Sequence, residues 1–275
     1  MKVSQQISHA ALVLLASALL TCLAQAQPVP LPRAHAHNDY QHERPLLDAL
    51  DHGFCSIEAD IHLVEGELMV AHDRDEVQPG RTLQALYLDP LRARIRQRHG
   101  RVYPNGPSVI LLIDIKSEAE ATYAALRRVL RQYADILTIF TPDALDEGPV
   151  TAIISGNRPR ATMEAEAVRY AAYDGRLDDL DADPPAPATF IPLVSSNWFT
   201  FARWLGRGAP PDEVLKRLEE TVAKAHAQGR KIRFWATSDN PVVWRELYDA
   251  GVDLLNADDL DGLRDFLLER EDRNR

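Results

Sequence analysis

Carboxylates at the ends of two predicted strands are the first residues in this sequence that could do chemistry. Glu58 and Asp60 are two residues apart near the end of a strand-like stretch, so both side chains point to the same face. Asp114 and Lys116 repeat this spacing at the end of residues 109–116, an apolar run that places them in the interior. Three interior carboxylates need a cation, and their oxygens suit Mg²⁺ or Ca²⁺. The structural alternative is an ion-pair network centred on Lys116.

Two histidines are predicted to reach the same end of the sheet as the carboxylates. His37 ends the first strand-like stretch, and His72 ends a short return strand, residues 67–71, after a turn at Gly66. Two histidines beside a hard cation could act as general acid and base on a phosphoryl group, whose charge the cation neutralises. We interpret five further histidines as packed or surface residues: His42, His52, His62, His99 and His226.

The elements that must position these side chains alternate between strand and helix. Eight such units in a chain of this length predict an α/β protein with a closed (β/α)8 barrel rather than an open doubly wound sheet. The predicted strands are residues 33–37, 55–63, 109–116, 150–155, 170–173, 190–195, 231–237 and 252–256. The predicted helices are residues 45–51, 83–98, 118–136, 160–168, 212–228, 242–250 and 262–271. Residues 181–187, rich in Asp and Pro, are predicted to form a loop.

The composition describes an ordinary globular chain that does not bind nucleic acid. The sequence has 275 residues, of which 45% are hydrophobic and 26% charged, enough apolar material for a sizeable core. Its formal net charge of -10 would repel a nucleic-acid backbone. No apolar run reaches the length of a transmembrane helix, so we expect a single domain at residues 27–275 and a monomer.

The first 26 residues have the pattern of a secretory signal peptide. Lys2 precedes an apolar run at residues 10–20, and Ala24 and Ala26 form a small-x-small cleavage site. This pattern predicts cleavage after Ala26 and a periplasmic or secreted protein. Lipidation at Cys22 is a weaker alternative, because the preceding Thr21 is larger than the residue such a site normally requires. The other cysteine, Cys55, is predicted to be an unpaired thiol buried in a strand.

Taken together, the motifs resemble a known superfamily. His37-Asn38-Asp39-Tyr40, the Glu-x-Asp pair at 58–60, His72 and the Asp-x-Lys at 114–116 resemble the glycerophosphodiester phosphodiesterase and phosphatidylinositol phospholipase C-like superfamily. The His-Asn-Asp-Tyr form is most similar to the branch named for "altered inheritance of mitochondria protein 6". The resemblance implies a phosphodiesterase barrel of the phospholipase C-like type. It also implies that His37 and His72 are acid and base and that Glu58, Asp60 and Asp114 hold one divalent cation.

The sequence departs from the superfamily at the first strand. Enzymes that act on glycerophosphodiesters commonly have His-Arg-Gly there, whereas this chain has His37-Asn38-Asp39. The phosphate-binding arginine is therefore missing or replaced from elsewhere, with Lys116 as a catalytic candidate. Asn38 and two further residues are candidates for substrate contact. Trp235 could form an apolar or stacking wall or lie in the core, and Asn256 could donate to a phosphoryl oxygen or form a turn. Residues 173–176 are candidates for the rim of the site.

The function that these residues favour is a secreted, metal-dependent phosphodiester hydrolase. Its expected substrate is a small-molecule or lipid phosphodiester: a glycerophosphodiester, or a phospholipid or lysophospholipid headgroup. The attacking oxygen could belong to water or to the substrate, which would give a cyclic phosphate. A zinc hydrolase of amidohydrolase type, suggested by His35-Ala36-His37, lacks further histidines on later strands. A non-catalytic envelope binding protein on the same barrel is the remaining alternative.

Overall fold

Eight parallel strands form a nearly closed barrel in the computed structural model, which describes residues 27–141 and 144–273. The order of the strands is β10-β9-β8-β7-β4-β2-β1-β11. A single backbone bridge between Arg233 and Leu254 joins the two ends of this sheet. The predicted (β/α)8 barrel is therefore confirmed. The strands are β1 (Leu31–Ala36), β2 (Phe54–Val64), β4 (Val109–Ile115), β7 (Val150–Gly156), β8 (Ala172–Gly175), β9 (Leu193–Asn197), β10 (Lys231–Trp235) and β11 (Leu255–Ala257).

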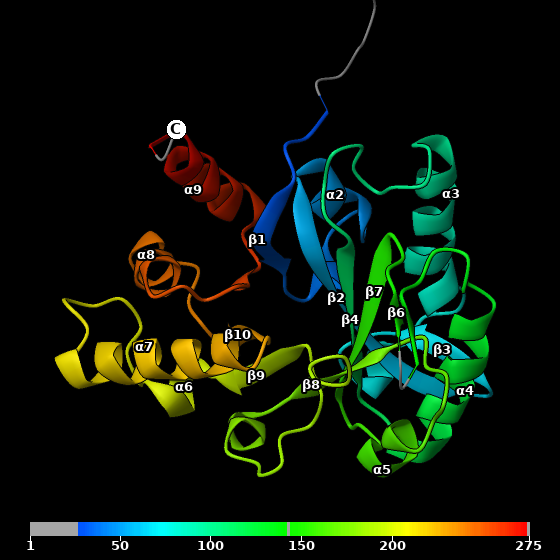
Figure 1. The fold of residues 1–275 in the computed structure, drawn as a ribbon. Helices are drawn as coiled ribbons and strands as arrows, with labels where there is room; N and C mark the ends of the chain where they lie inside the picture. The colour runs from blue at the N-terminus through cyan, green and yellow to red at the C-terminus, as the bar shows by residue number, and fades with distance from the viewer. Residues whose placement is uncertain (1–26, 142–143, 274–275) are drawn as a thin grey trace, which may run out of the picture.

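Helices surround this sheet, with α3 and α4 on one side and α7, α8 and α9 on the other (Figure 1). The α-helices are α2 (Leu47–Asp51), α3 (Asp89–Gln97), α4 (Ala119–Arg131), α5 (Arg160–Glu164), α6 (Trp198–Phe201), α7 (Asp212–Ala227), α8 (Pro241–Asp249) and α9 (Leu260–Arg273). Shorter helical turns are η1 (Asp39–Gln41), η2 (Arg74–Glu76), η3 (Gln84–Leu88) and η4 (Leu177–Leu180). Two small antiparallel additions complete the fold. β3 (Glu67–Val70) returns along β2 after Gly66, as predicted, and β5 (Ile139–Phe140) pairs with β6 (Leu145–Asp146).

Two helical segments differ from the sequence-based expectation. The predicted helix at residues 160–168 ends at Glu164, because the chain must turn back for Arg169 to exchange two backbone hydrogen bonds of 2.9 Å with Phe140. The short helix α6 was not expected. Asn197 begins it by accepting a hydrogen bond from the Thr200 backbone N–H at 3.1 Å, a standard N-cap. The predicted loop at residues 181–187 contains no regular structure.

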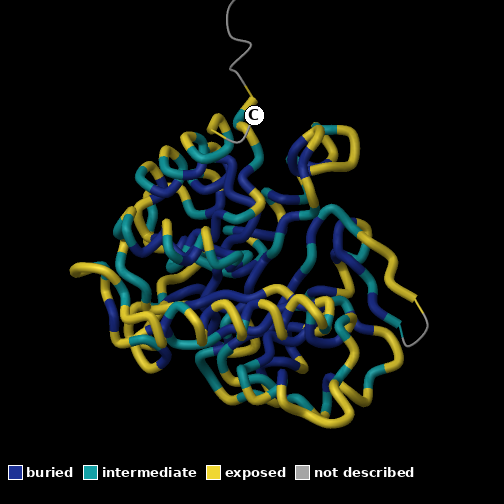
Figure 2. The backbone as a smooth tube through the Cα atoms, turned by 60° about the vertical axis from the view of Figure 1, so that its left-hand side comes forward, coloured by how far each residue is buried: buried dark blue, intermediate teal, exposed yellow. Residues whose placement is uncertain are grey.

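Side chains on the barrel strands alternate between the interior of the barrel and the helices. On β4, Leu111 and Ile113 belong to the large core under the helices, whereas Leu112 belongs to a smaller cluster inside the barrel. Asp114 follows Leu112 on the inward-facing register, so the barrel interior changes from apolar to charged toward the carboxyl ends of its strands. Figure 2 shows buried backbone through the centre of the molecule and exposed backbone on the outer loops. Cys55 is a buried free thiol, as predicted.

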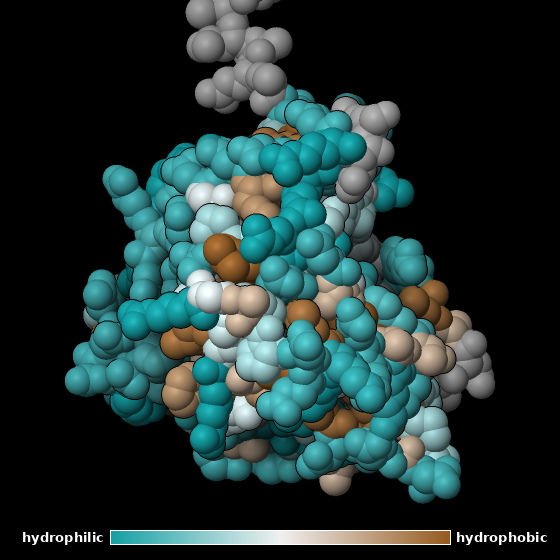
Figure 3. Space-filling view, turned by 90° about the vertical axis from the view of Figure 1, so that its left-hand side faces the viewer, coloured by the Kyte–Doolittle hydropathy of each residue, from teal (hydrophilic) through white to brown (hydrophobic). Residues whose placement is uncertain are grey.

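The surface carries no helix suited to crossing a membrane among the residues described. Figure 3 shows the face that carries α7 and α8, on which hydrophobic side chains form small separate areas among hydrophilic ones.

Candidate active site

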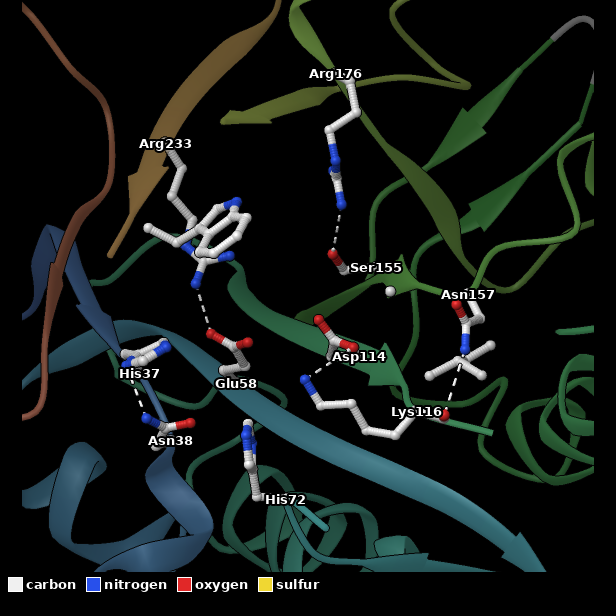
Figure 4. Close-up of a pocket in the computed structure, with 13 residues that line it drawn as sticks. His37, Asn38, Glu58, His72, Asp114, Lys116, Ser155, Asn157, Arg176 and Arg233 are labelled. Atoms are coloured by element: carbon white, nitrogen blue, oxygen red, sulfur yellow. Dashed lines mark hydrogen bonds and ion pairs between the residues drawn. The ribbon is translucent and has the colours of Figure 1, made fainter. Parts of the chain in front are cut away.

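A pocket of about 390 Å³ opens at the carboxyl ends of the barrel strands (Figure 4). Active sites of (β/α)8 barrels lie at this end of the fold. The residues that line the pocket include most of those singled out from the sequence: His37, Asn38, Glu58, His72, Asp114, Ile115, Lys116, Ser155, Gly156, Asn157, Arg176, Arg233 and Trp235.

Three carboxylates converge at this pocket, and two of them, Glu58 and Asp114, line it. Glu58, Asp60 and Asp114 each offer an oxygen within 4.8 Å of the others, because Asp60 and Asp114 lie opposite each other in the register of β2 and β4. Lys116 Nζ lies 3.1 Å from Asp60 Oδ2 and 3.3 Å from Asp114 Oδ1. Asp60 Oδ1 is buried and has no hydrogen-bond partner among the described residues. An unpartnered buried carboxylate oxygen fits a site that binds a cation.

The electrostatics of the cluster also favour added positive charge. Burial raises the pKa of Asp60, and it raises the pKa of Asp114 to about 6 despite the nearby ammonium. Burial acts to lower the pKa of Lys116, but the Asp60 and Asp114 carboxylates outweigh this effect and raise it. The charge of Lys116 is therefore not enough to keep the pKa of either aspartate at its ordinary value. A divalent cation bound by the three carboxylates would supply the missing positive charge.

Glu58 has two basic partners that the sequence analysis did not identify. Arg233 Nη2 lies 2.6 Å from Glu58 Oε2, and His35 Nε2 lies 3.1 Å from the same oxygen. Burial acts to raise the pKa of Glu58, but the Arg233 charge and the His35 hydrogen bond lower it. Burial and the Arg233 charge lower the pKa of His35 to about 3, so its imidazole is neutral. The neutral His35 therefore stabilises the Glu58 carboxylate through a hydrogen bond.

His37 is held by an acidic residue from the opposite end of the chain. Its Nδ1 lies 2.8 Å from Asp258 Oδ1 and 2.9 Å from Asn38 Nδ2. Although burial acts to lower the pKa of His37, the Asp258 hydrogen bond and nearby Glu58 raise it. Both contacts use Nδ1, so Nε2 is the nitrogen left to exchange a proton with a substrate in the pocket.

His72 is held in a similar way on the other side. Its Nδ1 lies 2.9 Å from Asp60 Oδ2, which again leaves Nε2 for the pocket. The Tyr40 hydroxyl lies 2.7 Å from the same Asp60 oxygen and 2.7 Å from Asn38 Oδ1, so it connects the two histidine loops. His62 Nε2 donates to the His72 backbone carbonyl at 3.1 Å and thus supports the segment that carries His72.

The three candidates for substrate contact occupy different positions. Asn38 lines the pocket in a left-handed backbone conformation with φ of 48°, which asparagine tolerates better than most residues. Trp235 also lines the pocket, and 37% of its surface is exposed. Asn256 is buried instead, and its Oδ1 accepts hydrogen bonds from Arg233 Nε at 3.0 Å and Nη2 at 2.8 Å. Asn256 therefore positions Arg233 rather than reaching into the pocket.

Two arginines line the pocket although this chain lacks the arginine of the superfamily's His-Arg-Gly motif, having Asn38 after His37. Arg233 comes from the middle of β10, and Arg176 follows β8. The signal for Arg233 in the sequence is its place two residues before Trp235 on the same strand face, between the buried Ile232 and Phe234.

Comparisons with known proteins agree with this geometry. A family model for the AIM6-like phosphodiesterase domain matches residues 22–174, and a model for the glycerophosphoryl diester phosphodiesterase family matches residues 231–261. A crystal structure of a glycerophosphodiester phosphodiesterase from Parabacteroides distasonis has a TM-score of 0.53 and 18% identity, covering 87% of this chain and 98% of the other. One from Agrobacterium tumefaciens has a TM-score of 0.52 and 17% identity, covering 86% and 99%. These two structures have the same barrel fold as this chain.

Curated relatives define the branch. The Eremothecium gossypii protein named "altered inheritance of mitochondria protein 6" is 31% identical, covering 86% of this chain and 69% of the relative. A homolog of that name from Arthroderma benhamiae is 29% identical, covering 86% and 84%. The chain belongs to the AIM6-like phosphodiesterase family, within the glycerophosphodiester phosphodiesterase superfamily.

The names of these relatives contradict one prediction. They refer to the inheritance of mitochondria, so the expectation of a periplasmic or secreted protein is wrong. That expectation depended on Lys2, the apolar run at residues 10–20 and the small-x-small site that ends at Ala26, a local pattern independent of the fold. The predicted signal peptide, its cleavage after Ala26 and the Cys22 alternative lie outside the described residues.

Proposed function

We propose that this chain is a metal-dependent phosphodiester hydrolase. Its substrate is a glycerophosphodiester, or the headgroup diester of a phospholipid or lysophospholipid. The observation that carries the proposal is the pair His37 and His72, each held at Nδ1 by a carboxylate and each with Nε2 left for the same pocket. A pair of this kind beside a cation site suits acid and base catalysis at a phosphoryl group.

The chain's own residues divide the reaction into proton transfers and charge stabilisation. One histidine removes the proton from the attacking oxygen as that oxygen forms its bond to phosphorus. The other protonates the alkoxide as the bond between phosphorus and the leaving oxygen breaks. Glu58, Asp60 and Asp114 hold one Mg²⁺ or Ca²⁺, which supplies positive charge for the phosphoryl oxygens. Lys116 adds a further positive charge at the same end of the pocket.

Cation dependence provides the test of this proposal. Hydrolysis of a diester panel should vanish with chelator and return with Mg²⁺ or Ca²⁺, because the clustered carboxylates otherwise repel the anionic substrate. Asp60→Asn should weaken binding of the cation measured directly by calorimetry. Asp75→Asn, at an exposed position on η2, is the matched control and should leave binding unchanged. Full activity in chelator would show that Lys116 alone neutralises the site and would contradict the proposed metal dependence.

A further inference from the structure

The pocket has a second wall, away from His37 and His72, that none of the steps above uses. Ser155 is the second-last residue of β7, Asn157 comes directly after this strand, and Arg176 follows the neighbouring strand β8. Figure 4 shows the Arg176 side chain reaching from this wall toward Ser155, on the side of the carboxylates opposite the two histidines.

The Arg176 guanidinium is fixed in place and keeps unused donors. Its Nη1 donates to Asp174 Oδ2 at 2.7 Å and to the Gly175 carbonyl at 2.8 Å. Its Nη2 has one distant contact, 3.4 Å from Ser155 Oγ, and its Nε has no hydrogen bond to the residues described. The side chain is 37% exposed. A fixed arginine with free N–H groups loses little conformational entropy when it binds an anion.

The Asp174 carboxylate has other partners besides Arg176, so pairing with Asp174 does not by itself explain why an arginine is present at this position. The fully buried Asp174 carboxylate already accepts hydrogen bonds from the Ser155 and Ser195 hydroxyls, each at 2.7 Å. A second guanidinium, Arg158, lies 4.0 Å from Asp174 Oδ2. Two guanidinium groups therefore lie near one carboxylate, and of the two it is Arg176 that lines the pocket. The opposite end of the pocket is acidic, because the two positive side chains there, Lys116 and Arg233, pair with a cluster of three carboxylates.

We propose that Arg176 forms an anion subsite for a second anionic group on the alcohol portion of the substrate, such as a carboxylate or phosphate. This proposal rests on the proposed phosphodiester hydrolysis and names its substrate class. The reacting phosphoryl group lies at the cation and the two histidines, while the second anion pairs with the free donors of Arg176. Arginine binds carboxylate and phosphate through paired N–H groups, so the subsite selects both a charge and a distance from the reacting phosphorus.

A matched pair of diesters tests the subsite. Glycerophosphoserine and glycerophosphoethanolamine differ by one carboxylate. The wild-type protein should prefer the serine diester by about tenfold in kcat/KM, because a charge-assisted pair contributes at this scale. Arg176→Gln should abolish that preference by raising KM for the serine diester, and Arg176→Lys should retain part of it. Arg270→Gln, which removes an arginine paired with Asp249 on the outer surface, should change neither rate.

Direct binding separates failure of the subsite from failure of the proposed function. In calorimetry, the His37→Ala variant should bind glycerophosphoserine more tightly than glycerophosphoethanolamine. Adding Arg176→Gln to this variant should abolish the difference in affinity. Preferential binding without hydrolysis by the wild-type protein would uphold the subsite and contradict the enzyme. Equal effects of Arg176→Gln on both diesters, or no preference in binding, would overturn the subsite. Repeating the pair as lysophospholipids in micelles shows whether the anion is recognised on a soluble diester or on a lipid headgroup.

Discussion

At the residue scale, the site depends on histidines whose orientation is set by acidic partners. Asp258 and Asp60 each hold the Nδ1 of one histidine, so the side chains need no rearrangement to present Nε2 to a substrate. Asp60 also belongs to the cation cluster, which couples the orientation of His72 to the cation site. His37 has no direct bond to the cluster, because its partner Asp258 lies outside it, and its link to Asp60 runs through Asn38 and Tyr40.

Replacing either histidine should remove catalysis without unfolding the protein. We expect His37→Ala and His72→Ala each to reduce turnover by roughly 10² to 10⁴. With a nitrophenyl leaving group, which needs no proton, the loss should be much smaller for the histidine that acts as general acid. His226→Ala, at a half-exposed surface site on α7, is the control. Equal modest losses for all three variants, or losses that follow the melting temperature, would show that the histidines are structural.

The sequence could locate the candidate catalytic residues but not the partners of their side chains. His37 and His72 were recognisable because each follows an apolar strand, and Glu58 and Asp114 because each interrupts the apolar pattern of a strand. Arg233 and His35 were not, since their role comes from contact with Glu58 across strands that are 175 and 23 residues away along the chain. Such pairings depend on the register of the closed barrel, which no local pattern encodes.

At the scale of elements, the loop after β1 depends on a buried carboxyl group. Asp39 Oδ2 accepts hydrogen bonds from the Leu46 backbone N–H at 2.6 Å and from the Tyr87 hydroxyl at 2.9 Å. These bonds connect η1 to the start of α2 and to η3. Burial nevertheless raises the pKa of Asp39 to about 7.

This carboxyl group should make stability depend on pH. The folded state retains the Asp39 proton up to about pH 7, whereas the ordinary value is 3.8, so its contribution to the free energy of unfolding falls as pH rises through this interval. Asp39→Asn cannot ionise. We expect the stability of the variant relative to the wild type, measured by urea unfolding, to increase between pH 5 and pH 8 by on the order of 3 kcal/mol. A constant difference across this range would contradict a protonated Asp39.

A glycine at the end of β7 makes room for the cation cluster. A Cβ atom at Gly156 would collide with the Asp114 carboxylate and with the Ile115 backbone, and its φ of 68° also disfavours other residues. Gly156→Ala should therefore displace Asp114 and weaken cation binding measured by calorimetry. Gly80→Ala is the matched control, because it has a φ of 81° but open space around its Cβ. Similar cation affinity in both variants would show that Asp114 is not a ligand.

At the scale of the whole molecule, the alternation of strands and helices was enough to predict the barrel. Each βα unit carries its own local signal, and eight of them leave few arrangements. The ends of the elements were less predictable. α5 is cut short by the backbone pairing of Arg169 with Phe140, a contact between segments that no helical pattern reveals. The prediction of the cellular compartment was wrong, because it was drawn from a short N-terminal pattern and not from the fold or from related proteins.

The central claim is that this barrel cleaves phosphodiesters with His37 and His72. The most direct measurement is phosphorus NMR of a panel of glycerophosphodiesters and lysophospholipids incubated with the purified protein and Mg²⁺ or Ca²⁺. We predict that at least one diester signal is replaced by a monoester or cyclic phosphate signal, which also identifies the attacking oxygen. The folded His37→Ala, His72→Ala double variant should leave every diester intact. No conversion of any diester by a folded wild-type protein that binds the cation would contradict the account and indicate a non-catalytic binding protein.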